Sequence, residues 1–216
     1  MRDFLRGGLF ALGMGVAAAG QALAEESLWL DLPWHERVGP GWYERLAERG
    51  DAEAQYRLGQ LYEDGIGVGS DPELAERWYA AAARQGHLQA QWRLAQQLKT
   101  EDPKAAAHWY RSAAERGHAP AAFNLAVMLE NAQGVDLDLE SAAALYEQAY
   151  VGGVAGAALN RGLLELKRPA KDEVMALAWL LRARAAGVAG AEAAVTAVGE
   201  GMAASERSRA EALAEE

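Results

Sequence analysis

The 216-residue chain is acidic, with 31 Asp and Glu residues against 21 Lys and Arg residues and a formal net charge of −10. This balance lacks the basic surface that binding to nucleic acid or anionic lipid requires, so we expect neither kind of partner. The chain has no cysteine, which excludes disulfide bonds and thiolate metal sites. Its stability must therefore come from packing.

The first 24 residues have the three parts of a secretory signal peptide. Arg2 and Arg6 precede a short apolar stretch, and Ala22-Leu23-Ala24 forms an Ala-x-Ala cleavage site. The apolar stretch is well short of the roughly 20 residues that a membrane span needs. We therefore expect cleavage after Ala24 and export to the periplasm or the medium, with no membrane span in the mature chain. Cleavage would remove two arginines and one aspartate, changing the net charge from −10 to −11.

Residues 25–39 are rich in tryptophan and match nothing later in the chain. We expect this segment to be an N-terminal cap, in which Trp29 and Trp34 cover the open apolar end of the structure that follows. Ligand binding by these tryptophans is the alternative.

A single skeleton recurs from residue 40 onward at the spacing of helical repeats. Its closing glycines are 36, 31, 36 and 34 residues apart, at Gly50, Gly86, Gly117, Gly153 and Gly187. An aromatic or leucine pair begins eight residues before each glycine, at Trp42-Tyr43, Trp78-Tyr79, Trp109-Tyr110, Leu145-Tyr146 and Trp179-Leu180. An aspartate, suited to cap a helix, stands fifteen residues before the last four glycines, at Asp71, Asp102, Asp138 and Asp172.

Each repeat predicts two helices. In the first full repeat, apolar residues at 54, 58, 61 and 62 form one helical stripe, and Asp71-Pro72 begins the second helix. We divide the solenoid, residues 40–199, into a half repeat 40–50, full repeats 51–86, 87–117, 118–153 and 154–187, and a last helix 188–199. Residues 200–216 are expected to form a polar capping helix.

The glycine-rich segment 64–70 contains Gly-x-Gly-x-Gly, a pattern found in phosphate-binding loops. No strand precedes it, and no Lys-Ser or Lys-Thr follows it. We therefore interpret these glycines as a link between two helices and reject nucleotide binding.

The unit from Ala52 to His87 resembles the Sel1-like repeat (SLR) family, a relative of the tetratricopeptide repeats. The family pattern reads roughly Ala-x-Ala-x-x-x-Leu-Gly-x-x-Tyr, a glycine-rich loop, then Ala-x-x-Trp-Tyr-x-x-Ala-Ala-x-x-Gly-His, and looser copies continue to Gly187. The resemblance implies an all-α fold, a right-handed α-solenoid of antiparallel helix pairs, acting as an interaction scaffold without shared catalytic residues. Bacterial members are often exported.

The repeated tryptophans are expected to be core residues, so Trp78→Ala should cost about 3–5 kcal/mol. His87 and His118 both follow a closing glycine, which indicates helix junctions rather than metal ligands. His35 and His108 have no partner at ligand spacing, and no serine lies in a Gly-x-Ser-x-Gly turn. We expect no metal, no cofactor and no catalysis.

The best candidate for a binding site is a series of polar residues on the first helices of the repeats. The seventh residue after each of the first four closing glycines is polar, and in two repeats so is the tenth. Together these residues, here called the polar ladder, are Arg57, Gln60, Arg93, Gln96, Asn124 and Asn160. Both positions lie on a helix face away from the apolar stripe. We expect this face to line the concave surface and to hold a protein or peptide; a merely solvated helix face is the alternative.

Arg161 occupies the position held by Leu58, Leu94 and Leu125 in the other repeats. It is either a tolerated departure whose stem covers apolar surface, which we favour, or a charge placed near the groove. The following segment 167–171 is the only basic cluster in the chain.

These features favour an exported scaffold that binds a protein or peptide in envelope signalling or assembly. An envelope hydrolase or β-lactam-binding protein is the alternative, since some disulfide-bonded members of the family have been linked to β-lactams. This chain has none of the cysteines of those members.

Overall fold

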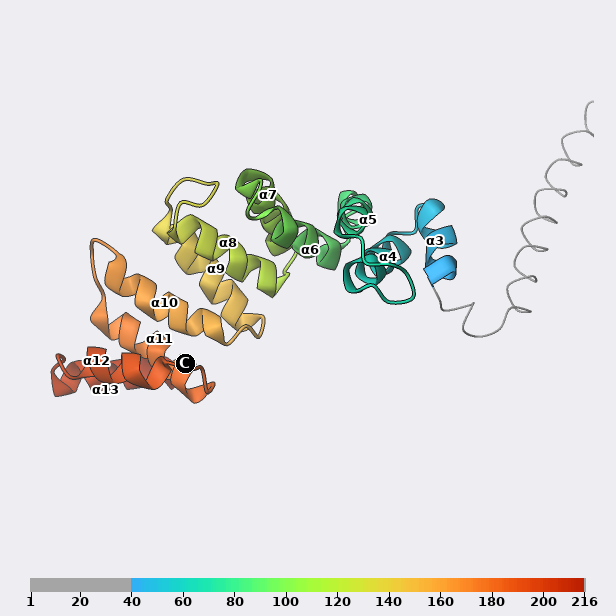
Figure 1. Cartoon of the computed structure of the whole chain (residues 1–216). Coiled ribbons are helices and arrows are strands. Elements are labelled where there is room, and N and C mark those ends of the chain that lie inside the picture. Colours follow the sequence, from blue (N-terminus) through green and yellow to red (C-terminus); the bar gives the residue numbers. More distant parts are fainter. Residues whose placement is uncertain (1–39, 216) are drawn as a thin grey trace, which may run out of the picture. The chain divides into compact units, whose positions relative to one another are not determined.

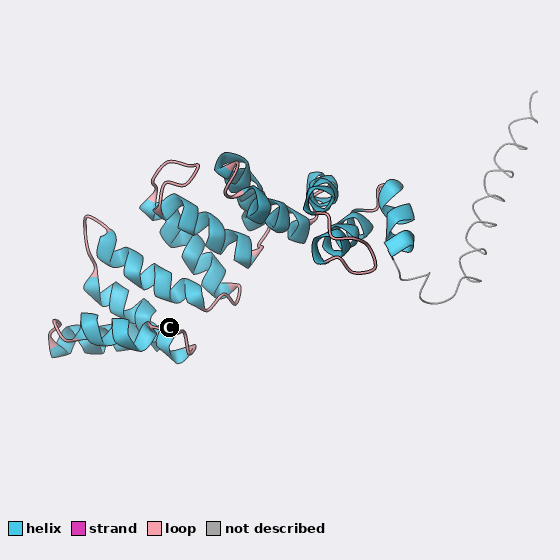
Figure 2. Ribbon diagram, in the orientation of Figure 1, coloured by secondary structure: helices cyan, strands magenta, loops and turns pink. Residues whose placement is uncertain are grey.

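The structure is a computed structural model that describes residues 40–215 (Figure 1). The expected signal peptide, residues 1–24, and the N-terminal segment 25–39 lie outside the described residues. The described chain consists of helices joined by loops, without a strand (Figure 2). None of the described helices is long and apolar enough to cross a membrane.

The helices follow one another as pairs with short connections, as an all-α solenoid requires. Their bounds are α3 Pro40–Glu48, α4 Ala52–Asp64, α5 Pro72–Arg84, α6 Leu88–Leu98, α7 Pro103–Glu115, α8 Ala119–Glu130, α9 Leu139–Val151, α10 Gly156–Lys167, α11 Glu173–Ala185, α12 Ala191–Gly199 and α13 Ala204–Glu215. The chain divides into two compact units, one ending at Ala75 and the other running from Glu76 to Glu216.

In the first unit, α3 packs against α4. The side-chain amide of Gln55 on α4 donates a 3.0 Å hydrogen bond to the carbonyl of Ala47 on α3. The glycine-rich segment also returns to α3, since a Cβ on Gly67 would lie 2.9 Å from Cγ of Pro40. These glycines link α4 to α5, as predicted.

In the second unit, each helix from α6 to α11 packs against the next one along the chain. Buried alanines let the helices approach closely, and the tyrosine of the repeat fills the space between them: Tyr79, Tyr110 and Tyr146 are fully buried. The tryptophan before the tyrosine was expected to be the core residue, yet Trp78 and Trp109 are only half-buried. Trp179, at 5% exposure, is the buried exception.

The helix ends follow the signals in the sequence. Backbone N–H groups of the first turns donate to the side chains of Asp51, Asp71, Asp102, Asp138 and Asp172 at 2.7–3.2 Å. The five closing glycines have positive φ values between 70° and 95°, a conformation that costs other residues free energy.

The last three helices form the C-terminal end of the second unit. Both α12 and α13 pack against α11, and Met202 and Ala210 are buried with Leu177 and Ala178. The guanidinium of Arg182 on α11 donates to the carbonyls of Leu213, at 2.6 Å, and Ala214, at 3.4 Å, near the end of α13. The capping helix expected at 200–216 therefore covers an apolar face of α11.

Candidate functional site: polar positions of the first helices

The polar ladder begins on α4 in the first unit. Arg57 is exposed, and its Nε lies 2.7 Å from Oε1 of Glu53, one helical turn earlier. Its NH1 donates a 3.2 Å hydrogen bond to Oε1 of Gln60, so two residues of the ladder are in direct contact. Glu53, Arg57 and Gln60 lie on one face of α4. This face offers hydrogen-bond donors and acceptors, but the charge of Arg57 is largely neutralised by Glu53.

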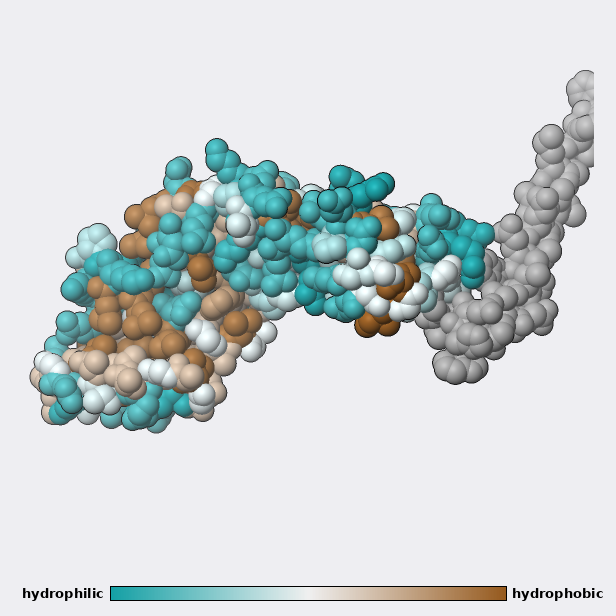
Figure 3. Space-filling model, viewed as in Figure 1, coloured by the Kyte–Doolittle hydropathy of each residue, from teal (hydrophilic) through white to brown (hydrophobic). Residues whose placement is uncertain are grey.

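The other members of the polar ladder lie on α6, α8 and α10 in the second unit. Gln96 is exposed, while Arg93, Asn124 and Asn160 are half-buried. The guanidinium carbon of Arg93 lies 5.3 Å from the centre of the Trp92 ring, a cation–π distance. Figure 3 shows hydrophilic side chains over much of the visible face around α5 to α7, with hydrophobic residues reaching the surface around α8 to α11.

Asn160 differs from the rest of the polar ladder because it takes part in an internal network. Its Nδ2 lies 3.4 Å from the hydroxyl of Tyr146 on α9, and that hydroxyl donates to Glu130 at the end of α8. Nζ of Lys167, at the end of α10, lies 2.5 Å from Oε1 of Glu130. The network fixes three successive helices, so Asn160 has a structural role that the sequence pattern did not reveal.

The two junction histidines act as helix caps. The N–H of Ala90 donates to Nδ1 of His87, and the N–H of Ala121 donates to Nδ1 of His118, both at 3.2 Å. Burial lowers the pKa of His118, which keeps its imidazole neutral and able to accept this bond. Within the described residues, no group of three or more acidic or histidine side chains is arranged to hold a metal ion.

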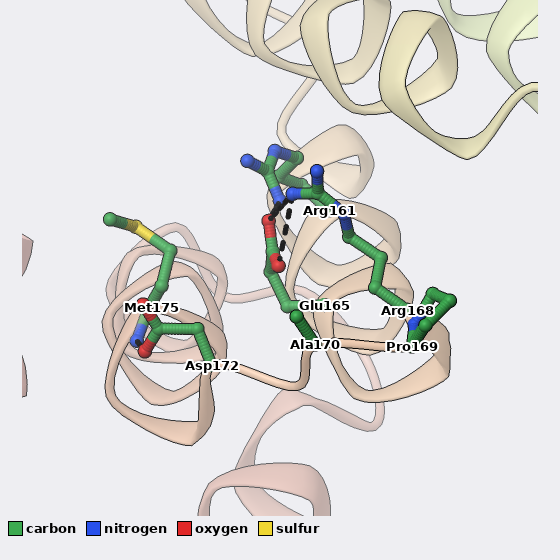
Figure 4. A pocket seen from close by; sticks show the side chains of 7 residues that line it. All are labelled: Arg161, Glu165, Arg168, Pro169, Ala170, Asp172 and Met175. Atoms are coloured by element: carbon green, nitrogen blue, oxygen red, sulfur yellow. Dashed lines mark hydrogen bonds and ion pairs between the residues drawn. The ribbon is translucent and has the colours of Figure 1, made fainter.

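Arg161 takes part in a buried ion pair with Glu165, one turn later on α10. Only 9% of Arg161 and 3% of Glu165 are exposed. Arg168 donates from NH1 to both oxygens of the same carboxylate, at 3.0 and 3.3 Å. Figure 4 shows the two guanidinium groups converging on Glu165. Arg161 therefore places a paired charge at the position that is apolar in the other repeats, and its guanidinium carbon lies 5.6 Å from the centre of the Trp179 ring.

The ion pair borders an open cleft of about 470 Å³ between the end of α10 and the start of α11. We call it the Arg161 cleft; its lining residues are Arg161, Glu165, Arg168, Pro169, Ala170, Asp172 and Met175. The helices approach closely beside it, since a Cβ on Gly162 would lie 2.8 Å from Cγ of Leu180. Two signals in the sequence mark this place: an arginine where three repeats have leucine, and a glutamate four residues later.

Comparison with known protein families identifies Sel1 repeats at residues 52–87, 88–118, 119–150 and 155–188, one for each helix pair from α4–α5 to α10–α11. The chain belongs to the Sel1 repeat family. Sel1 repeats form helical scaffolds that typically mediate protein–protein interaction and are generally not catalytic. Comparison with curated protein sequences gives no match.

Two solved structures are similar to this Sel1 repeat chain. One is c5321, a protective antigen present in uropathogenic Escherichia coli strains and displaying an SLR fold, with 31% identity and a TM-score of 0.72 over 81% of the present chain. The other is a Sel1 repeat protein from Oxalobacter formigenes, with 27% identity and a TM-score of 0.65 over 68% of the present chain. The matches span 39% and 64% of those two chains.

Proposed function

We propose that this protein is an exported Sel1 repeat scaffold that binds a protein or peptide through the polar ladder, in envelope signalling or assembly. One observation carries the proposal. Each first helix carries a hydrogen-bonding side chain that is at least partly exposed, directly before a buried residue of the same repeat: Arg57 before Leu58, Arg93 before Leu94, Asn124 before Leu125 and Asn160 before Arg161.

The chemistry of these positions suits an extended polypeptide. Guanidinium and amide groups donate hydrogen bonds to backbone carbonyls and carboxylates, and amides also accept bonds from backbone N–H groups. The repeat spacing supplies such a group once per helix pair, so a partner gains several modest contacts instead of one strong one. Acidic side chains on the partner would add charge complementarity to Arg57 and Arg93.

The test is affinity capture from an envelope extract with residues 25–216 as bait. The variant Arg57→Gln/Arg93→Gln removes both cations, and glutamine avoids placing a second carboxylate beside Glu53. The matched control is Arg111→Gln/Arg209→Gln, which makes the same charge change at exposed positions on α7 and α13. Circular dichroism melts establish that all three baits are folded.

We expect a partner that the parent and the control retain and that the ladder variant loses. Photo-crosslinking then locates the contact: a benzoylphenylalanine at Gln96 should capture the partner, and one at Arg111 should not. A partner held equally by parent and ladder variant, or crosslinked only from Arg111, would rule out the polar ladder as the binding face.

Export rests on the N-terminal pattern and has its own test. Mass spectrometry of the full-length product, expressed in a Gram-negative host, should give a mature chain that begins at Glu25 and is released with the periplasmic fraction. Ala22→Arg/Ala24→Arg should block cleavage, because the site requires small residues. A cytoplasmic product with its N-terminal 24 residues intact would contradict export.

A further inference from the structure

The Arg161 cleft has more hydrogen-bond donors than its own residues can satisfy. A guanidinium group carries five N–H donors and no acceptor. The two guanidinium groups lining the cleft share a single carboxylate, that of Glu165. The other carboxylate in the lining, Asp172, accepts the backbone N–H of Met175 at 2.9 Å as the cap of α11. Nε of Arg161 is buried and has no hydrogen-bond partner within the described residues.

The lining residues carry two guanidinium groups and two carboxylates, so their formal charges balance. Both guanidinium groups lie against Glu165, and Lys171, an exposed residue of the same loop, adds a cation to this segment of the chain. Burying an ion pair carries a desolvation cost, which the other three repeats avoid with a leucine at the position of Arg161. Departures from a protein's own packing rule are expected at functional sites.

The rest of the lining is apolar. Pro169 and Ala170 belong to the exposed connection between α10 and α11, and Met175, in the first turn of α11, also lines the cleft. Figure 4 shows these three residues around the two guanidinium groups. A methionine side chain adapts its shape to different apolar groups. The cleft therefore presents cationic donors beside an apolar wall, and Arg168, with 31% of its side chain exposed, is within reach of solvent and of a ligand.

We propose that the Arg161 cleft binds a carboxylate that is attached to an apolar residue, such as the free C-terminus of a peptide. The carboxylate of the ligand accepts hydrogen bonds from the guanidinium groups of Arg168 and Arg161. The apolar side chain of the ligand packs against Met175 and Pro169. This site is separate from the polar ladder, and its existence does not depend on the function proposed for that face.

The test uses small probes and the methyl signals of methionine. The mature chain retains Met128, Met175 and Met202, of which only Met175 lines the cleft and the other two are buried elsewhere. N-acetyl-L-leucine, its neutral amide and inorganic phosphate are titrated separately into protein labelled with ¹³C at the methionine methyl groups. Met175→Leu identifies the signal of Met175.

We expect N-acetyl-L-leucine to shift the Met175 signal saturably in the millimolar range, while Met128 and Met202 stay unchanged. The neutral amide should bind at least tenfold more weakly, because it lacks the charge, and phosphate should bind more weakly because it makes no apolar contact. Equal binding of the amide, tighter binding of phosphate, or no saturable shift with N-acetyl-L-leucine would overturn the proposal.

Two variants test the guanidinium groups. Arg168→Gln removes the more exposed cation, and Arg161→Leu restores the residue found in the other repeats; each should weaken binding of N-acetyl-L-leucine at least tenfold. Arg209→Gln, an exposed position on α13, makes the same charge change and should leave binding unaltered. An unchanged affinity in a folded Arg168→Gln protein would refute the site even if Arg161→Leu proves unstable.

Discussion

The hydroxyl of Tyr146 donates a 2.6 Å hydrogen bond to Oε2 of Glu130, sixteen residues earlier in the chain. The other oxygen of that carboxylate pairs with Lys167, so one side chain connects α8, α9 and α10. Burial and the neighbouring carboxylate of Glu130 both raise the pKa of Tyr146, which keeps the phenol protonated and able to donate. The phenol of Tyr146 therefore remains a donor at neutral and mildly alkaline pH.

Tyr146→Phe should lower the free energy of unfolding by about 1.5–3 kcal/mol, the usual contribution of a hydrogen bond to a charged group. Urea denaturation measures the change. Tyr110→Phe is the matched control, because Tyr110 is equally buried at the equivalent position and burial alone, without a neighbouring carboxylate, raises the pKa of its phenol. Equal losses in the two variants would show that the bond to Glu130 adds nothing to stability.

His118 should make stability sensitive to mild acid. Its Nδ1 accepts the hydrogen bond from Ala121 only when unprotonated, and burial lowers its pKa below the value of about 6.5 in the unfolded chain. The unfolded state thus binds more protons in this range, so the contribution is complete above about pH 6.5 and decreases as pH falls through the folded-state pKa.

The variant His118→Asn isolates this effect, since asparagine keeps the cap and does not titrate. Thermal melts between pH 7.5 and pH 5 should show a smaller loss of Tm for the variant than for the parent. Parallel pH profiles of the two proteins would exclude His118 as the source of the acid sensitivity.

The burial of Trp78 and Tyr79 indicates that the tyrosine, and not the tryptophan, contributes more to stability. Tyr79 is fully buried and Trp78 only half-buried, so Tyr79→Ala should cost about 3–5 kcal/mol and Trp78→Ala clearly less. Chemical denaturation of both single variants gives the order. A larger loss of unfolding free energy for Trp78→Ala than for Tyr79→Ala would support the prediction from the sequence that the tryptophan is the core residue.

The fold was predictable because several local signals agree at the same spacing. Closing glycines, capping aspartates and apolar stripes mark the ends and buried faces of the same helices, and none of these signals requires knowledge of distant contacts. The relative burial of Trp78 and Tyr79 was not predictable in this way. Adjacent residues on a helix differ in direction by only 100°, so the path of the neighbouring helix decides which ring is enclosed.

Gly134 should tolerate substitution less well than Gly117, although both have positive φ values. A Cβ at Gly134 would lie 2.5 Å from the backbone carbonyl carbon of Pro103, whereas a Cβ at Gly117 meets nothing within 4 Å. Gly117→Ala should therefore cost only the conformational penalty of about 1–2 kcal/mol. Gly134→Ala should cost more, as measured by urea denaturation, because backbone atoms must move. Equal costs would mean that this loop shifts without penalty.

The candidate sites were predictable only in part. The sequence identified Arg161 as unusual and the segment 167–171 as basic, but Glu165 was one carboxylate among many until the helix placed it beneath both guanidinium groups. Likewise, Asn160 fits the polar ladder by spacing, while its contact with Tyr146 depends on how α9 and α10 pack. Side-chain pairing across helices depends on three-dimensional packing, which periodicity along one helix does not specify.

A stack of similar repeats has no natural end, because the last repeat offers its outer face to a further copy of itself. In this chain α13 occupies that face on α11, and Arg182 holds the carbonyls of Leu213 and Ala214. Truncation before residue 204 would therefore do more than remove a polar helix. It would expose Leu177 and Leu181 and would remove the carbonyl partners of Arg182, on a surface that is shaped to bind a helix. Because another copy of the protein could bind to this surface, we expect the truncated protein to associate into open chains.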